Sequence, residues 1–124
     1  MKEYPILFKN KNMICYDKGL SNDFKITHYK DRKEVISVLC KLSKYPNIYF
    51  NVIIYEGKSV YNTKRYGFIS KTLIKDKKGK WKTFETESSL INDYNHWKER
   101  GINAMIEAFI ENELETLKDL KYLH

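Results

Sequence analysis

The stretch Ile48-Tyr49-Phe50-Asn51-Val52-Ile53-Ile54-Tyr55 decides the fold class, because almost every residue in it is β-branched or aromatic. Such residues favour extended backbone. One face of a strand here would carry four apolar side chains, those of Ile48, Phe50, Val52 and Ile54. The near-continuous apolar run is typical of a central strand. The sequence therefore predicts a sheet with residues 48–55 near its middle.

Strand signals continue beyond this stretch. Glu56-Gly57-Lys58 predicts a turn into a second strand region over residues 60–75, where Gly67 indicates a bulge or bend. Asp76-Lys77-Lys78-Gly79 is a strong turn signal, and a third strand is expected over residues 80–87. These segments together predict a three-stranded antiparallel meander.

Two helices are expected to flank the meander. Asp31-Arg32-Lys33-Glu34 has the form of a capping box, and five apolar residues then recur at helical spacing, namely Val35, Ile36, Val38, Leu39 and Leu42. Tyr45-Pro46 would end this helix. A longer helix is expected to begin between Leu90 and Asp93 and to include Gly101, because apolar residues advance by threes and fours as far as Leu117.

The predicted fold class is α+β, a two-layer sandwich in which two helices flank the three-stranded meander (α-β-β-β-α). Residues 1–30 form an irregular or β-rich N-terminal extension, with strand-sized pieces at 6–8, 13–16 and 24–27 separated by turns at 10–12 and 17–19. With 124 residues and no repeat or linker, the chain is expected to be one domain over residues 1–124, with its core at 31–124.

Cellular location is predicted from what the sequence lacks. No apolar stretch is long enough for a membrane helix, and the first residues lack the apolar region of a signal peptide. We therefore expect a cytoplasmic protein of a bacterial host cell, with no membrane partner. In that compartment Cys15 and Cys40 are expected to be reduced, with Cys40 in the core.

Enzyme motifs are missing from the sequence. It contains no G-x-G-x-x-G, P-loop, G-x-S-x-G or H-E-x-x-H motif. His96 and Glu99 are spaced to share a helix face, but no other residues complete a metal-ligand set with them. The sequence predicts a protein that is not an enzyme, with no catalytic residues, metal site or cofactor.

Positive charge is concentrated in one short segment. The chain has a net charge of +7, and residues 58–82 carry nine Lys and Arg residues against Asp76 alone, a net +8. Clustered ammonium groups release counterions from phosphates, and a nearby aromatic ring can stack on an unpaired base. Lysines of this kind also protect sheet edges against aggregation. The candidate binding residues are Lys64, Arg65, Lys71, Lys75, Lys77, Lys78, Lys80, Trp81 and Lys82.

Tyrosines indicate a second possible binding surface. Tyr49 and Tyr55 would lie on the strand face opposite Phe50. If the helices cover one side of the sheet alone, these rings are exposed, as is typical of binding surfaces. Coverage of this face by residues 1–30 is the alternative.

Two family resemblances bear on function. The predicted helix–three strands–helix order over residues 31–115 resembles the double-stranded-RNA-binding domain. However, the chain has Glu56-Gly57-Lys58-Ser59 where that family has Gly-Pro and a histidine. The predicted helix over 34–42, the segment 47–52 and the pattern Gly101-Ile102-Asn103-Ala104-Met105-Ile106 are similar to small accessory proteins of phages and prophages.

The second resemblance implies a non-catalytic, anti-CRISPR-like protein that inhibits a host defence or nucleic-acid-handling complex. Its partner would be a host protein or ribonucleoprotein complex, contacted through the basic hairpin. The alternative is a direct nucleic-acid-binding module that uses Lys71 to Lys82 together with Trp81. The sequence leaves the oligomeric state open.

Overall fold

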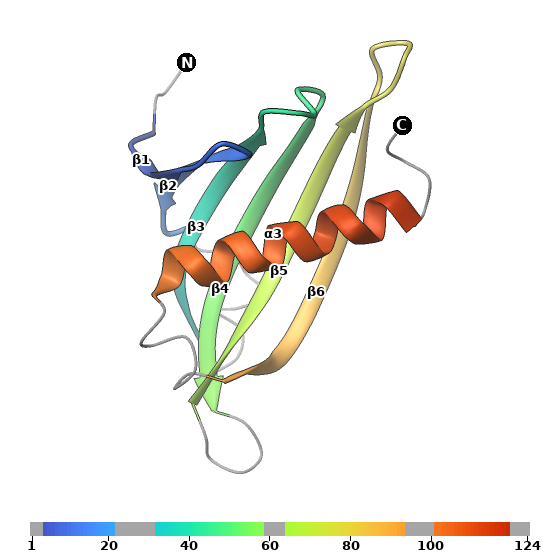
Figure 1. Cartoon of the computed structure of the whole chain (residues 1–124). Coiled ribbons are helices and arrows are strands. Elements are labelled where there is room, and N and C mark those ends of the chain that lie inside the picture. Colours follow the sequence, from blue (N-terminus) through green and yellow to red (C-terminus); the bar gives the residue numbers. More distant parts are fainter. Residues whose placement is uncertain (1–3, 22–31, 59–63, 94–100, 120–124) are drawn as a thin grey trace. The chain divides into compact units, whose positions relative to one another are not determined.

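A computed structural model of the chain describes residues 4–21, 32–58, 64–93 and 101–119. The chain divides into two compact units, Met1–Asp93 and Tyr94–His124. The first unit contains a six-stranded sheet and the second contains one helix, α3, over Ile102–Asp119 (Figure 1). The expectation of a single domain stays a prediction.

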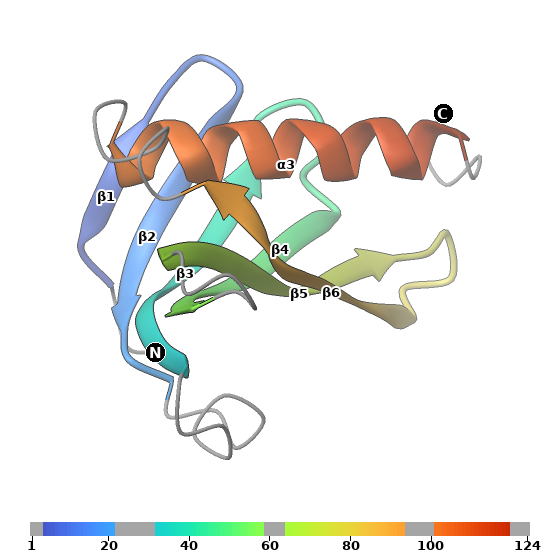
Figure 2. The ribbon, with the colours of Figure 1, turned by 90° about the horizontal axis from the view of Figure 1, so that it is seen from below.

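The sheet is antiparallel throughout, and its spatial order β1-β2-β3-β4-β5-β6 is the order of the strands in the sequence. It is visibly twisted (Figure 2). The strand bounds are Ile6–Lys9 for β1, Met13–Gly19 for β2, Arg32–Leu42 for β3, Ile48–Lys58 for β4, Lys64–Lys75 for β5 and Trp81–Asp93 for β6.

The predicted fold class is wrong, because the structure is a six-stranded sheet with a single described helix, not a three-stranded meander between two helices. The first predicted helix is strand β3, which pairs with β2 on one side and β4 on the other. Its buried residues alternate with a period of two, since Val38, Cys40 and Leu42 share one face. The β-branched side chains of residues 35, 36 and 38 favour this extended form.

The second predicted helix begins later than expected. Residues 90–93 belong to β6, residues 94–100 lie outside the described part of the chain, and α3 starts at Ile102. Gly101 therefore precedes the helix, where its φ of 89° is a conformation that favours glycine. Its carbonyl accepts a hydrogen bond from the Met105 amide at 3.3 Å. The apolar residues of α3 follow the predicted spacing of threes and fours.

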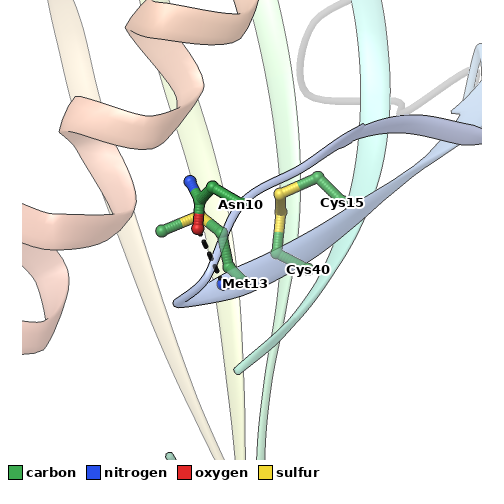
Figure 3. Close-up of a disulfide and its surroundings, with 4 residues drawn as sticks. All are labelled: Asn10, Met13, Cys15 and Cys40. Carbon is green, nitrogen blue, oxygen red and sulfur yellow. Dashed lines mark hydrogen bonds between the residues drawn. A yellow bond between two sulfur atoms is a disulfide. The ribbon is translucent and has the colours of Figure 1, made fainter. Parts of the chain in front are cut away.

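The predicted strands in the N-terminal extension are confirmed for β1 and β2, which form a hairpin. The Asn10 side chain stabilises its turn by accepting hydrogen bonds from the amides of Asn12 at 2.8 Å and of Met13 at 2.9 Å. Figure 3 shows the hydrogen bond from Met13. The turn expected at 17–19 is instead the end of β2, with a register shift between Asp17 and Gly19. The expected strand at 24–27 lies outside the described residues.

Cys15 and Cys40 form a disulfide between β2 and β3, so the prediction of two reduced thiols is wrong (Figure 3). The two residues are direct partners in the register, with Cα atoms 4.2 Å apart. That separation is close to the spacing of a non-hydrogen-bonded antiparallel pair, which brings the two side chains together. The helix expected at 31–42 concealed this pairing.

The predicted irregularity at Gly67 is confirmed, because the β5–β6 register shifts between Tyr66 and Phe68. On its other side Gly67 is the direct partner of Tyr55. A Cβ atom at position 67 would lie 2.7 Å from Cε2 of the Tyr55 ring. The glycine therefore leaves the space that the tyrosine ring occupies.

Within the described residues, no helix is long and apolar enough to cross a membrane.

Candidate functional site

The two faces of the sheet differ in the burial of their side chains. One face, called here the buried face, is almost completely shielded from solvent along its central strands. Its members include Cys15, Val38, Cys40, Phe50, Val52, Ile54 and Phe68. The opposite face, called here the open face, carries half-buried and exposed side chains over much of its area. Along the central strands, the side chains that a ligand could reach are therefore mostly on the open face.

An aromatic–lysine row crosses the open face, and its members are Tyr16, Lys41, Tyr49, Trp81 and Lys75. Its first half joins β2, β3 and β4. The Lys41 ammonium lies 5.6 Å from the centroid of the Tyr16 ring and 5.8 Å from that of the Tyr49 ring. Both distances fall within the roughly 6 Å range of a cation–π contact. The lysine therefore holds its charge above two aromatic rings.

The second half of the row joins β4, β5 and β6. The ring centroids of Tyr49 and Trp81 are 5.4 Å apart, with the ring planes tilted by 36°. Trp81 is paired in the register with Lys75, whose ammonium lies 5.9 Å from the centroid of the Trp81 ring. Trp81 remains 46% exposed. The row thus alternates flat rings and cations from β2 to β6, a distance of about 19 Å at the usual strand spacing.

A third lysine extends the row on β2. Lys18 donates a hydrogen bond to Asn51 Oδ1 at 3.2 Å, and Asn51 lies two residues beyond Tyr49 on the same face of β4. The same ammonium lies 5.9 Å from the centroid of the Tyr4 ring. Three cations, from Lys18, Lys41 and Lys75, therefore share the open face with four aromatic rings.

The structure brings only two of the nine predicted binding residues into this row, Lys75 and Trp81. Lys82 follows Trp81 on β6 and pairs with Ile74, so it lies on the other face of the sheet. Lys77, Lys78 and Lys80 are exposed in the turn between β5 and β6. The lysines of the hairpin therefore do not form one surface.

The turn that carries those three lysines is well defined. Asp76 Oδ1 accepts hydrogen bonds from the amides of Lys78 and Lys80, both at 2.9 Å. The Asp76 amide donates to the Lys80 carbonyl at 2.8 Å, and Gly79 has a φ of 81°. One carboxylate thus fixes the backbone from which the lysine side chains extend.

The remaining predicted residues are opposed by acids or lie far away. Lys71 is on the open face but faces Glu85 directly across β5 and β6. Lys64 forms an ion pair with Glu56 at 3.4 Å. β5 has 12 residues, so Lys64 and Arg65 lie roughly 30–36 Å from Lys75 at the usual rise per residue.

Sequence reasoning missed Tyr16 and Lys41 as members of the site. Tyr49 was expected on the face opposite Phe50, where the structure has it, half-buried. Tyr55, expected on that face too, is only 1% exposed, because its ring lies over Gly67 and forms a buried cluster with Ile69 and Ile53. Lys41 could have been found only with β3 assigned as a strand, since its register partner is Tyr49.

Metal-ligating side chains do not come together in the part of the chain that the structure describes. This part contains no group of three His, Cys, Asp or Glu side chains that could hold a metal ion. His96 and Glu99 lie outside that part. The open face therefore offers flat apolar rings and positive charge as its means of recognition.

Comparisons with protein-family models, with curated proteins and with solved structures found no match to this chain.

Proposed function

We propose that the protein binds nucleic acid through the open face of its sheet, with Lys41 and Lys75 contacting phosphates beside the rings of Tyr49 and Trp81. The observation that carries this proposal is the aromatic–lysine row itself, in which cations and rings alternate across neighbouring strands. The proposal narrows the alternative drawn from the sequence, Lys71 to Lys82 with Trp81, because it retains only Lys75 and Trp81 of that segment and adds Lys41 and Tyr49. It assigns no catalytic step to the chain.

Charge and chemistry support this assignment. The chain has a net charge of +7 and a pI near 9.3, so it attracts polyanions over long distances. Phosphate contacts from lysine release counterions, whereas aromatic rings interact with the bases. If the only role of this surface were to keep the protein soluble, the lysines would be sufficient and the exposed aromatic rings would not be needed. An aromatic residue that is 46% exposed on the edge strand β6, beside the lysine-bearing strand β5, has a clearer role in contacting a planar ligand.

The test is a binding titration with labelled oligonucleotides at two salt concentrations, roughly 50 and 200 mM, where phosphate contacts weaken strongly. Lys41→Glu and Lys75→Glu are expected to lower the affinity. Lys41→Gln and Lys75→Gln should each reduce the slope of log affinity against log salt by about 0.7 to 0.9, because one fewer phosphate is neutralised. Lys82→Glu is the matched control, because Lys82 is exposed on the same hairpin but on the other sheet face.

The Lys82→Glu control shows whether nucleic acid binds to the open face in particular or to the positive charge of the protein in general. If Lys82→Glu weakens binding as much as Lys75→Glu, the open face is not the site and only net charge matters. If the wild-type protein binds neither DNA nor RNA at the lower salt concentration, nucleic-acid binding itself is excluded.

The second candidate is the one implied by the resemblance to phage accessory proteins, namely inhibition of a host defence or nucleic-acid-handling complex. The observation that favours it is the fixed turn at Asp76, which presents three exposed lysines at one end of the sheet (Figure 1). Such a turn suits an acidic groove on a partner protein.

A pull-down from a bacterial lysate treated with nuclease tests the second candidate. A protein partner should be retained by the wild type and absent from the Lys77→Glu/Lys78→Glu variant, and the purified partner's activity should fall when the wild type is added. Retention of no protein after nuclease treatment would exclude this function while leaving nucleic-acid binding open.

A further inference from the structure

We infer that the nucleic acid bound by the open face is single-stranded, and that an unpaired base stacks on Trp81, beside Lys75 and Tyr49. This inference rests on the proposed function and names its ligand class.

The exposure of Trp81 is the first step. The centroid of its ring system lies 5.4 Å from that of Tyr49, and the Lys75 ammonium lies 5.9 Å from the Trp81 centroid. Even with these two neighbours the residue keeps 46% of its surface exposed. Nearly half of the surface of this large aromatic residue therefore remains accessible to a ligand beside a cation.

The shape of the ligand follows from that surface. In a duplex the flat faces of the bases are stacked on one another, so a duplex offers a protein its phosphates and the edges of its bases. A ring lying on a sheet can stack only on a base whose face is free. Sheet faces with exposed aromatic residues hold two or three unpaired bases of RNA in this way.

The spacing of the cations matches such a strand. The cations alternate with the rings in the strand order, with Lys41 on β3, Tyr49 on β4, Lys75 on β5 and Trp81 on β6. A nucleic-acid strand that runs across the sheet from a base on Trp81 therefore meets an ammonium group on every second β-strand. Lys18 continues the positive charge towards β2. The row spans about 19 Å, which is enough for a few consecutive nucleotides.

The experiment compares four probes: oligo(dT), oligo(rU), a dA·dT duplex of the same length, and heparin, which carries negative charge but no bases. The wild type should bind oligo(dT) or oligo(rU) more tightly than the duplex. Trp81→Leu should weaken binding to the single strands about fivefold or more, in line with the loss of one stacked base. Trp81→Phe should restore most of that affinity, and heparin binding should be unchanged in both variants.

Fluorescence gives a second readout of the stacking. The chain has two tryptophans, so Trp97→Phe leaves Trp81 as the sole tryptophan. Its emission should be quenched by oligo(dT) and much less by heparin. The affinity measurements on the Trp81 variants need no change at position 97, so they stand even if that substitution impairs folding.

Distinct outcomes separate this inference from the proposed function. If Trp81→Leu binds oligo(dT) as well as the wild type does, or if the duplex binds as tightly as the single strands, the inference is overturned. Nucleic-acid binding then still stands, provided that Lys75→Glu weakens it and Lys82→Glu does not. If none of the nucleic acids binds to the wild type, both proposals fail together.

Discussion

Gly67 is the residue whose replacement tests the packing of the open face most directly. Gly67→Ala is expected to destabilise the protein by about 1–3 kcal/mol, because the new methyl group would overlap the Tyr55 ring and overpacking a filled site costs this much. Urea unfolding measures the loss. Thr83→Val, at an exposed position of β6, is the control and should change the free energy of unfolding by less than about 0.5 kcal/mol.

A double variant of Gly67 and Tyr55 checks independently whether these two residues are in contact. In Tyr55→Ala/Gly67→Ala the added methyl group no longer meets a ring, so the double variant should lose less stability than the sum of the two single variants. Strict additivity would show that the Tyr55 ring moves aside without cost.

Residue types alone predicted part of the site. Trp81 and Lys75 stood out because an aromatic residue lay within a run of lysines, and Tyr49 because it alternates with apolar neighbours. Lys41 carried no such signal. Its importance comes from facing Tyr49 across two strands, and that register cannot be read from residue identity.

The β5–β6 turn depends on one side chain, that of Asp76, for two of its hydrogen bonds. Asp76→Ala removes the acceptor of two backbone hydrogen bonds and should destabilise the hairpin by about 1–2 kcal/mol. Amide hydrogen exchange at Lys78 and Lys80 should become faster. Asp76→Asn keeps an oxygen in the same place, so exchange there should stay close to the wild-type rate. Equal exchange rates in all three proteins would mean that backbone contacts alone hold the turn.

The Cys15–Cys40 disulfide links the β1–β2 hairpin to β3. The two cysteines are 25 residues apart, and closing a loop of this length stabilises a protein by about 3 kcal/mol. Reduction is therefore expected to lower the unfolding midpoint in urea. The variant Cys15→Ala/Cys40→Ala should unfold at the same urea concentration with and without reductant. Detection of two free thiols in the unreduced, denatured wild type would contradict the disulfide.

Residues 31–42 show why one element was assigned wrongly. Apolar residues at 35, 36, 38, 39 and 42 satisfy helical spacing, yet residues 36, 38, 40 and 42 equally satisfy the alternation of a strand. The extended conformation is favoured over the helix because β2 and β4, on the two sides of β3, supply hydrogen-bond partners along its length. The isolated run 48–55 had no such ambiguity, because its β-branched and aromatic residues leave few helix-favouring positions.

At the scale of the whole molecule, charge has a consequence for purification. If the open face binds nucleic acid as proposed, this protein, with its net charge of +7, should carry host nucleic acid when it is prepared at low salt. Its ratio of absorbance at 260 and 280 nm should be high and should fall after washing with roughly 1 M salt, where charges are screened within about 3 Å. A low ratio before the wash would weaken the proposed function.

The antiparallel meander could be predicted around residues 48–87, but the full sheet could not. The two N-terminal strands were recognised as strand-sized pieces, and the turn at 76–79 and the bulge at Gly67 were also identified. The sequence did not predict that these strands belong to one sheet. A helix at the position of β3 would leave β2 without the strand that connects it to β4. Local sequence signals report strand propensity, whereas sheet size depends on which strands meet.

Every strand of this sheet after β1 pairs with the strand that precedes it in the chain. During synthesis, each segment leaving the ribosome therefore finds its partner already present, and no later strand has to be inserted between two earlier ones. Contacts of this kind close short loops, which favours rapid folding. Trp81 lies on the sixth strand, so the aromatic–lysine row is completed only after the other five strands have been made.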